Sequence, residues 1–151
     1  MCGDCDWGRD FGRCVVVTAS VRLAKVEDVA ACLAISNLDA AHGYANFSLA
    51  PETIEEWLAA FDEHRPWWVA EQDGSVVGFA RGSSFRGREG YNFTTEVGVY
   101  VAPAAQGTGV GRALYEVLLP ALRAADYHTA IACIALPNDT SVALHEACGF
   151  T

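Results

Sequence analysis

Basic residues are scarce in this sequence. Ten lysines and arginines stand against 19 aspartates and glutamates, which gives the 151-residue chain a formal net charge of −9. Proteins that bind nucleic acids use clustered Lys and Arg to neutralise phosphates and release their counterions. The charge balance therefore argues against a nucleic-acid partner, and any anionic ligand has to be held by local groups.

Long apolar runs and targeting features are missing as well. No stretch of apolar residues approaches the roughly 20 that a membrane-spanning helix needs. The first six residues lack the basic and apolar regions of a signal peptide. We therefore expect a cytoplasmic protein without a membrane partner. A hydrophobic content of 52% suffices for one buried core, so we expect a single domain over 15–151 and a leader outside the fold at 1–14.

Six cysteines are present, and they divide into two groups. Three lie in apolar periodic segments, where a thiol usually behaves as a small hydrophobe: Cys32, Cys133 and Cys148. Cys2 and Cys5 form a Cys-x-x-Cys pair, a common half of a zinc site, with Cys14 not far away. Because a fourth ligand is not apparent nearby, we favour a leader over a metal site and predict no bound metal.

Short runs of β-formers alternate with segments of helical periodicity along the chain. Strands are predicted at 15–23, 67–71, 76–80, 93–101 and 128–136. Helices are predicted at 26–35, 51–61, 109–121 and 141–147. Asp73-Gly74 suits a tight hairpin, and the later strand–helix–strand order favours parallel pairing. The sequence therefore predicts an α/β domain with a mixed central sheet flanked by helices.

Proline and glycine positions predict where the helices begin and end. Pro51 suits the first turn of the second helix, while Pro120 should kink or end the third, because an interior proline costs about 3 kcal/mol. Gly149 is predicted to stop the last helix. That helix has little to pack against before the chain stops, so we expect the natural protein to continue beyond Thr151.

The motif that carries chemistry is Gln106-Gly107-Thr108-Gly109-Val110-Gly111, directly after a predicted strand and at the start of a predicted helix. Glycines let a ligand approach the backbone, and the free N–H groups of a helix N-terminus bind phosphate oxygens. The segment lacks the Gly-Lys-Ser/Thr of a Walker loop and the spacing of a dinucleotide fingerprint. Taken alone, it is either an anion-binding loop or a plain glycine-rich turn.

The arrangement Gln-x-x-Gly-x-Gly resembles the loop with which the GNAT superfamily binds the pyrophosphate of acetyl-CoA. A second motif agrees: Asn138, Ser141, His145 and the pair Gly149-Phe150 resemble the helix that closes the CoA site in that superfamily. Three segments are similar to the phosphinothricin N-acetyltransferases, and the likeness runs from about Val21 to the end: 46–47, 91–96 and 136–147.

The resemblance implies a GNAT-type fold, acetyl-CoA as co-substrate and a homodimer. It implies transfer of an acetyl group to a small amino-acid-like acceptor of the phosphinothricin, methionine sulfoximine or methionine sulfone type. The positions that it assigns to CoA are Val99, Tyr100, Val101, Gln106, Gly107, Thr108, Gly109, Val110, Gly111, Arg112 and Asn138.

Two residues are candidates for the reacting centre. Within the resemblance, Glu96 occupies the place of the general base, and an attacking amine needs a group that accepts its proton. His145 occupies a place near the reacting atoms, where it could act as an acid or orient the substrate. The alternatives are a solvated strand glutamate and a packing histidine, and we favour the functional readings.

The resemblance also assigns residues to the acceptor: Phe47, Phe85, Arg86, Arg88 and Tyr91. A guanidinium suits a carboxylate or phosphinate, although a loop arginine is usually solvated and Phe47 could equally belong to the core. Gly98 and Ala135 depart from the family pattern in segments expected to face the pocket, which leaves the acceptor open.

A non-catalytic acyl-CoA-binding or regulatory module is the alternative function, encouraged by Pro120 and by the abrupt C-terminus. Turnover would separate it from an enzyme. Other amino acids are alternative acceptors, while protein N-termini fit the paired arginines less well.

Overall fold

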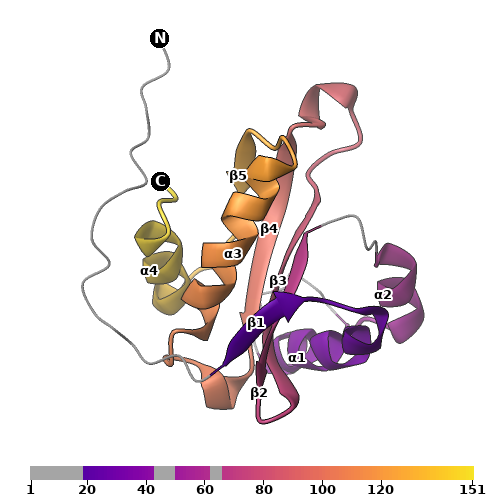
Figure 1. Ribbon diagram of the computed structural model, residues 1–151, viewed down its shortest axis with the longest axis vertical. Helices are drawn as coiled ribbons and strands as arrows, with labels where there is room; N and C mark the ends of the chain where they lie inside the picture. Colours follow the sequence, from indigo (N-terminus) through magenta and orange to yellow (C-terminus); the bar gives the residue numbers. More distant parts are fainter. Residues whose placement is uncertain (1–18, 43–49, 62–65) are drawn as a thin grey trace.

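The computed structural model describes residues 19–42, 50–61 and 66–151. In this part of the chain, one sheet has the strand order β1-β2-β3-β4-β5 (Figure 1). Strands β1 to β4 pair antiparallel, and β5 runs parallel to β4. The strands are β1 (Ser20–Leu23), β2 (Trp67–Gln72), β3 (Ser75–Ser84), β4 (Thr94–Val101) and β5 (Thr129–Ile131).

Helices cover both faces of the sheet. Helix α3 packs on one face, α1 and α2 pack on the other, and α4 lies beside α3 (Figure 1). The helices are α1 (Val29–His42), α2 (Ile54–Ala60), α3 (Val110–Ala124) and α4 (Asp139–Ala147). Three short 3₁₀ turns complete the order: η1 (Val26–Asp28), η2 (Glu89–Tyr91) and η3 (Pro103–Ala105).

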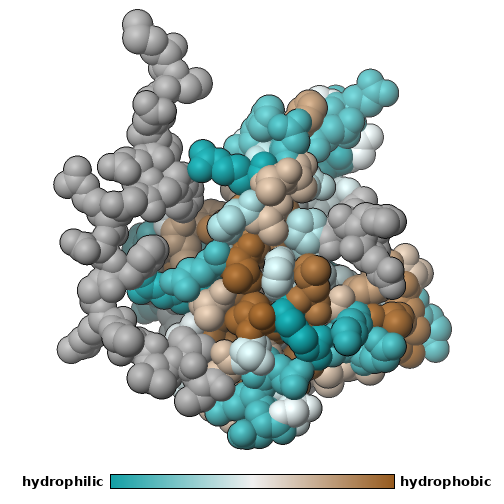
Figure 2. All heavy atoms as spheres, in the orientation of Figure 1, coloured by the Kyte–Doolittle hydropathy of each residue, from teal (hydrophilic) through white to brown (hydrophobic). Residues whose placement is uncertain are grey.

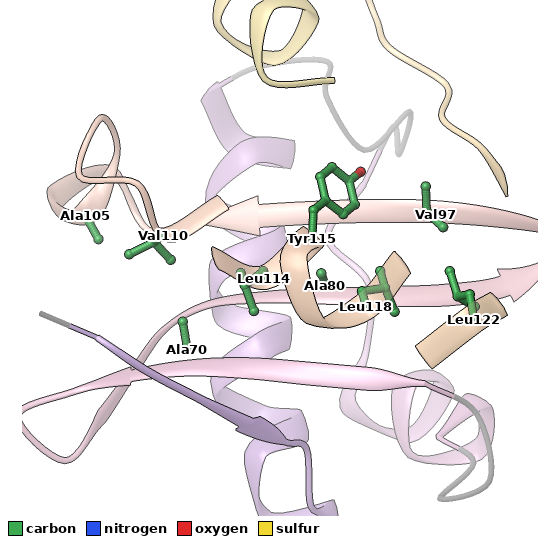
Figure 3. Close-up of a cluster of buried hydrophobic side chains, with 9 residues drawn as sticks. All are labelled: Ala70, Ala80, Val97, Ala105, Val110, Leu114, Tyr115, Leu118 and Leu122. Atoms are coloured by element: carbon green, nitrogen blue, oxygen red, sulfur yellow. The ribbon is translucent and has the colours of Figure 1, made fainter. Parts of the chain in front are cut away.

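The apolar stripe of α3 forms the larger core. Every fourth residue of the helix is buried against the sheet, in the series Val110, Leu114, Leu118 and Leu122 (Figure 3). Full burial of such a side chain contributes about 1.5–3 kcal/mol. The sheet has a small residue where this stripe packs on it. Gly82 leaves room for Leu122, because a Cβ added at Gly82 would lie only 2.9 Å from Leu122 Cδ2. The close approach fixes how α3 lies across the sheet.

Proline positions proved a poor guide to helix ends. Helix α3 continues through Pro120 to Ala124, because buried residues on both sides of the proline hold it to the sheet. Pro51 lies outside α2, whose N-cap is Thr53: its hydroxyl accepts from Glu56 N–H at 3.3 Å, and Glu56 Oε2 accepts from Thr53 N–H at 2.9 Å. Leu58 of α2, which follows the buried Trp57, is 44% exposed.

Other predicted elements agree more closely. The β2–β3 hairpin turns at Asp73 and Gly74, both with positive φ, as the sequence predicts. Gly149, also at positive φ, follows α4, and the Phe150 N–H donates to the His145 carbonyl at 3.0 Å. Of the predicted first strand, 20–23 is strand and 15–18 lies outside the described residues.

The last strand is much shorter than predicted. It spans Thr129–Ile131 instead of 128–136, since β4 and β5 pair only up to Glu96 opposite Ile131. Cys133, which follows this point, is exposed, so its prediction as core is wrong. Cys32 is fully buried, as predicted, and Cys148 is partly buried. Cys2, Cys5 and Cys14 lie outside the described residues.

Burial raises the pKa of the Cys32 thiol to about 12. This thiol belongs to α1 and packs in the smaller core, where Trp57, Trp67 and Phe79 meet edge-on or tilted at centroid distances of 5.6–6.1 Å. The sheet face under α1 and α2 is therefore aromatic, whereas the face under α3 is aliphatic.

No helix in the described part of the chain is long and apolar enough to cross a membrane.

An ion cluster ties β1 to η1 and β2. The Arg22 guanidinium contacts Asp28 through two hydrogen bonds of 2.7 and 2.9 Å, and its Nε donates to Glu71 at 2.9 Å. Asp28 also accepts from the Lys25 N–H at 2.8 Å. The hydrogen bond from Arg22 is the largest cause that lowers the pKa of Asp28 in the folded chain.

We predict that Asp28→Asn lowers the unfolding free energy by about 1–3 kcal/mol near neutral pH, the usual range for a lost charged hydrogen bond. Because folding lowers the pKa of Asp28, its contribution is present above the pKa of the unfolded chain and disappears as acid protonates the folded carboxyl. Urea unfolding between about pH 3 and 7 should show a flatter acid limb for the variant than for the native chain. Parallel acid limbs would contradict this role.

Candidate active site

An open cavity of about 700 Å³ lies where β4 and the segment after β5 part. Its walls come from β3, the second half of β4, the loop 105–109, the first turn of α3, residues 133–138 and α4. The connection between β3 and β4 lies at the far end of the sheet and presents a mostly hydrophilic tip (Figures 1 and 2). The cavity brings most of the predicted CoA and catalytic positions together.

The predicted phosphate loop forms one edge of the cavity. Gly107 and Gly109 have φ angles of +74° and +87°, which only glycine adopts without strain. Gln106 Nε2 donates to the Val101 carbonyl at 3.1 Å, and Thr108 Oγ1 donates to the Ala105 carbonyl at 2.6 Å. The two polar side chains of the motif thus fix the loop, and the glycines expose its backbone.

Helix α3 begins directly after this loop with an N-terminus that carries no side-chain cap. Gly109 is the N-cap and accepts from the Ala113 N–H at 3.0 Å, which leaves the N–H groups of 110–112 without an intrahelical acceptor. Their partial positive charge adds to the helix dipole. The helix end is therefore chemically suited to an anion such as a phosphate.

Two residues of the 106–111 motif also contribute to packing, which the sequence did not predict. The Val110 side chain is buried in the core, so only its backbone can serve a ligand. Gly111 lines the cavity, but a Cβ there would lie 2.9 Å from Leu144 Cδ2 of α4. Glycine at 111 therefore also permits the close contact of α3 with α4.

The remaining CoA candidates are spread along the cavity wall. Val99, Tyr100 and Val101 pair with β3 on one side, and their other edge has no β5 partner within the described residues. Arg112 lines the cavity and forms an ion pair of 3.3 Å with Glu116. Asn138 caps α4, where its Oδ1 accepts from the Ser141 N–H at 3.1 Å.

Glu96 is half-buried at the point where the two strands part. Its register partners are Ser83 on β3 and Ile131 on β5, and its carboxylate lines the cavity. Burial raises the pKa of the neighbouring Cys133 thiol, and the negative charge of Glu96 raises it further. A carboxylate in this place can accept a proton from a group bound in the cavity.

His145 is 6% exposed, and both of its ring nitrogens have partners. Nδ1 lies 2.7 Å from the Ser141 carbonyl, which can only accept, so Nδ1 carries the proton. Nε2 is then an acceptor for the Tyr115 hydroxyl at 2.7 Å, and burial raises the pKa of that hydroxyl above its ordinary value. The Tyr115 hydroxyl points from α3 toward α4 (Figure 3). Sequence reasoning missed this tyrosine, which directly follows Leu114 of the apolar stripe of α3.

The predicted acceptor residues that the structure describes do not line the main cavity. Phe85, Arg86 and Tyr91 line a separate cavity of about 180 Å³, where the Arg86 guanidinium lies 5.1 Å from the Phe85 ring and 5.7 Å from the Tyr91 ring. Arg88 is exposed and lines neither cavity. Phe47 lies outside the described residues.

The structure adds residues that sequence reasoning did not select. Arg81 and Ser83 of β3 line the main cavity on the same side as Glu96, and Gly98 and Ala135 line it as expected. The available signal was Arg81 itself, a charged residue that directly follows the apolar run 76–80.

Comparison with known proteins gives the family. The profile of the Acetyltransferase (GNAT) family matches residues 32–150. Phosphinothricin N-acetyltransferase of Streptomyces viridochromogenes is 39% identical over 134 residues, which cover 87% of this chain and 73% of that protein. The L-methionine sulfoximine/L-methionine sulfone acetyltransferase of Salmonella typhimurium is 33% identical over 136 residues, which cover 87% and 80%.

A solved structure agrees with these relatives. The GNAT superfamily phosphinothricin acetyltransferase from Sinorhizobium meliloti, in complex with AcCoA, matches with a TM-score of 0.84 and 32% identity, over 89% of this chain and 75% of that one. The chain therefore belongs to the GNAT acetyltransferase family. Its enzyme class is that of the N-acetyltransferases, and the predicted fold class is confirmed.

We predict that Tyr115→Phe lowers the unfolding free energy by about 1–3 kcal/mol, because it leaves the buried Nε2 of His145 without a donor. The native chain should show the Nδ1–H tautomer of His145 in ¹⁵N-histidine NMR spectra, held by the Ser141 carbonyl. Phe150 also packs against His145, so Phe150→Leu is a control that changes the packing and keeps both hydrogen bonds. An Nε2–H tautomer in the native chain would contradict the assignment.

Proposed function

We propose that this protein transfers an acetyl group from acetyl-CoA to the amino group of a small amino-acid-like acceptor. The observation that carries the proposal is that an uncapped helix N-terminus and a half-buried carboxylate open into one cavity. The relatives named above are acetyltransferases for phosphinothricin and for methionine sulfoximine or sulfone, and one neighbour was solved with AcCoA.

The phosphates of acetyl-CoA suit the loop and the first turn of α3. Glycines at positive φ leave the loop backbone open, and the N–H groups of 110–112 supply donors without a counter-cation. The amide groups of the pantetheine arm suit the edge of 99–101, which lacks a β5 partner within the described residues. The residues present therefore fit the co-substrate.

Glu96 is the group that we assign as general base. The amine must be neutral to attack the thioester carbon, so its proton passes to the Glu96 carboxylate, directly or through water. The N–C bond forms first and gives a tetrahedral intermediate. Its collapse breaks the C–S bond, and a proton lost by the nitrogen passes through water to the departing thiolate, so the products are the N-acetyl amide and CoA. Backbone N–H groups at the edge of β4 can hold the oxyanion during this step.

His145 is assigned an orienting role. Both ring nitrogens are engaged, one by a carbonyl and the other by the Tyr115 hydroxyl, so donating a proton would break a buried hydrogen bond. We therefore place His145 as a wall of the cavity held by α3 and α4, rather than as the acid for the leaving thiolate.

A non-catalytic CoA-binding module would share the loop and the helix end. The half-buried Glu96 in the same cavity favours an enzyme, because CoA binding alone gives no reason to place a carboxylate there. Release of free CoA thiol in the presence of amino acids separates the two functions.

We predict that Gly107→Ala raises the acetyl-CoA Kd by about tenfold or more, because a Cβ at the loop backbone obstructs the phosphates. Gly74→Ala is the matched control: both glycines have φ near +75°, and neither Cβ would meet an atom within 4 Å. Both variants should lose about 1–2 kcal/mol of stability from left-handed strain. Calorimetric titration that shows equal Kd values for the two variants would refute the loop assignment.

We predict that Glu96→Gln lowers kcat by about 10²–10⁴-fold, the usual contribution of a general base, with the acetyl-CoA Kd changed less than about twofold. The exposed Glu55→Gln of α2 is the charge-matched control. Steady-state rates of CoA release give kcat, and calorimetric titration gives the acetyl-CoA Kd. Equal losses in kcat and in affinity would reject the base assignment.

A further inference from the structure

Arg81 lies on β3 beside the carboxylate of Glu96. The register pairs Arg81 with Gly98 and Ser83 with Glu96, and residues two apart on a strand share one face of the sheet. Arg81 and Glu96 are therefore diagonal neighbours on the same face, at a backbone separation of about 7–8 Å. Both line the main cavity.

The Arg81 guanidinium lies against two aromatic rings, and no described carboxylate forms an ion pair with it. Its Cζ lies 4.6 Å from the centroid of the Trp57 ring and 5.2 Å from that of the Trp67 ring. Both tryptophans are buried, at 3% and 5% exposure, so their positions are fixed by the core. A guanidinium that stacks on an aromatic face keeps its N–H donors free in its own plane.

The donors of Arg81 have no acceptor among the described residues. Two other arginines there bind carboxylates: Arg22 binds Asp28 and Glu71, and Arg112 binds Glu116. Arg81 lines the open cavity, and the N–H donors of a guanidinium are suited to an anion that arrives from solution.

We propose that Arg81 binds the carboxylate of the acceptor and makes the site selective for free amino acids. This rests on the proposed function and names the residue that recognises its substrate class. A free amino acid carries a cationic amine and an anionic carboxylate on one carbon. The negative Glu96 carboxylate faces the cationic amine, and the positive Arg81 guanidinium faces the anionic carboxylate. The two side chains are therefore complementary to a zwitterionic amino acid.

The assignment differs from the one that the sequence suggests. Arg86 occupies the separate cavity with Phe85 and Tyr91, and Arg88 lines neither cavity. Arg81 is the arginine of β3 that shares the cavity with the proposed base. Arg81 and Arg86 are therefore competing candidates for the residue that binds the carboxylate, and the experiment tests a variant of each.

The experiment compares methionine sulfone with its carboxamide, which keeps the amine and the side chain but loses the carboxylate. Rates are measured with the native chain, Arg81→Met, Arg81→Lys and Arg86→Met. Methionine can still pack on the two tryptophans, so Arg81→Met removes mainly the charge and the donors. Arg123→Met, on the exposed last turn of α3, is the control for charge removal elsewhere.

We expect Arg81→Met to raise the KM for methionine sulfone by about tenfold or more and to change the KM for the carboxamide and for acetyl-CoA less than about twofold. The KM of Arg81→Lys for methionine sulfone should lie between those of the native chain and Arg81→Met, because lysine keeps the charge but loses the paired N–H donors of the guanidinium. Equal losses on the acid and the carboxamide would mean that Arg81 only supports the tryptophans, and would overturn the proposal. A loss selective for the acid in Arg86→Met instead of Arg81→Met would also overturn it.

Binding measurements separate this proposal from the proposed chemistry. Calorimetric titration of methionine sulfone into each protein saturated with CoA needs no turnover. Weaker binding to Arg81→Met than to Arg123→Met supports the role of Arg81 even if no acetyl transfer is detected. Equal binding to the two variants, or no binding to the native chain, overturns it, whereas a native chain that binds acetyl-CoA but transfers nothing overturns only the catalytic step.

Discussion

The site depends on the parting of β4 from β5. The two strands pair from Thr94 to Glu96 and then separate, so the edge of 97–101 faces a cavity instead of a neighbouring strand. The Val101 carbonyl accepts from Gln106, and a ligand with amide and carbonyl groups can pair with other N–H and C=O groups of this strand edge. The same parting shortens β5 and leaves the Cys133 thiol beside Glu96.

Helix α3 converts this gap into a site. Its apolar stripe fixes it across small residues of the sheet, and its N-terminus therefore meets the cavity in one orientation. The same helix sets the opposite wall, because Gly111 admits Leu144 of α4 and Tyr115 donates to His145. Packing, anion binding and the orientation of the histidine are thus properties of one element.

Charge is distributed unevenly in this acidic chain. Arg22 is neutralised by two carboxylates in a structural cluster, whereas Arg81 rests on tryptophan rings and faces the cavity. A helix N-terminus supplies positive potential without a basic residue, so the overall charge of −9 does not prevent binding of an anionic co-substrate. Local geometry, and not net charge, decides which anions the protein can bind.

Local patterns determined the elements that local chemistry controls. Asp73-Gly74 specified a hairpin, the glycines of 106–111 specified a loop with positive φ, and the spacing of Val110, Leu114 and Leu118 specified a buried helix face. Tertiary contacts decided the rest. Buried leucines on both sides of Pro120 hold α3 to the sheet, so the helix does not end at the proline. Strand β5 ends at Ile131, where its pairing with β4 stops. The register of β3 and β4 places Arg81, and not Arg86, beside Glu96. The spacing of residues in the sequence predicts which side chains share one face of a helix or strand. It does not predict which helices and strands meet across a cavity, because that depends on contacts between residues far apart in the chain.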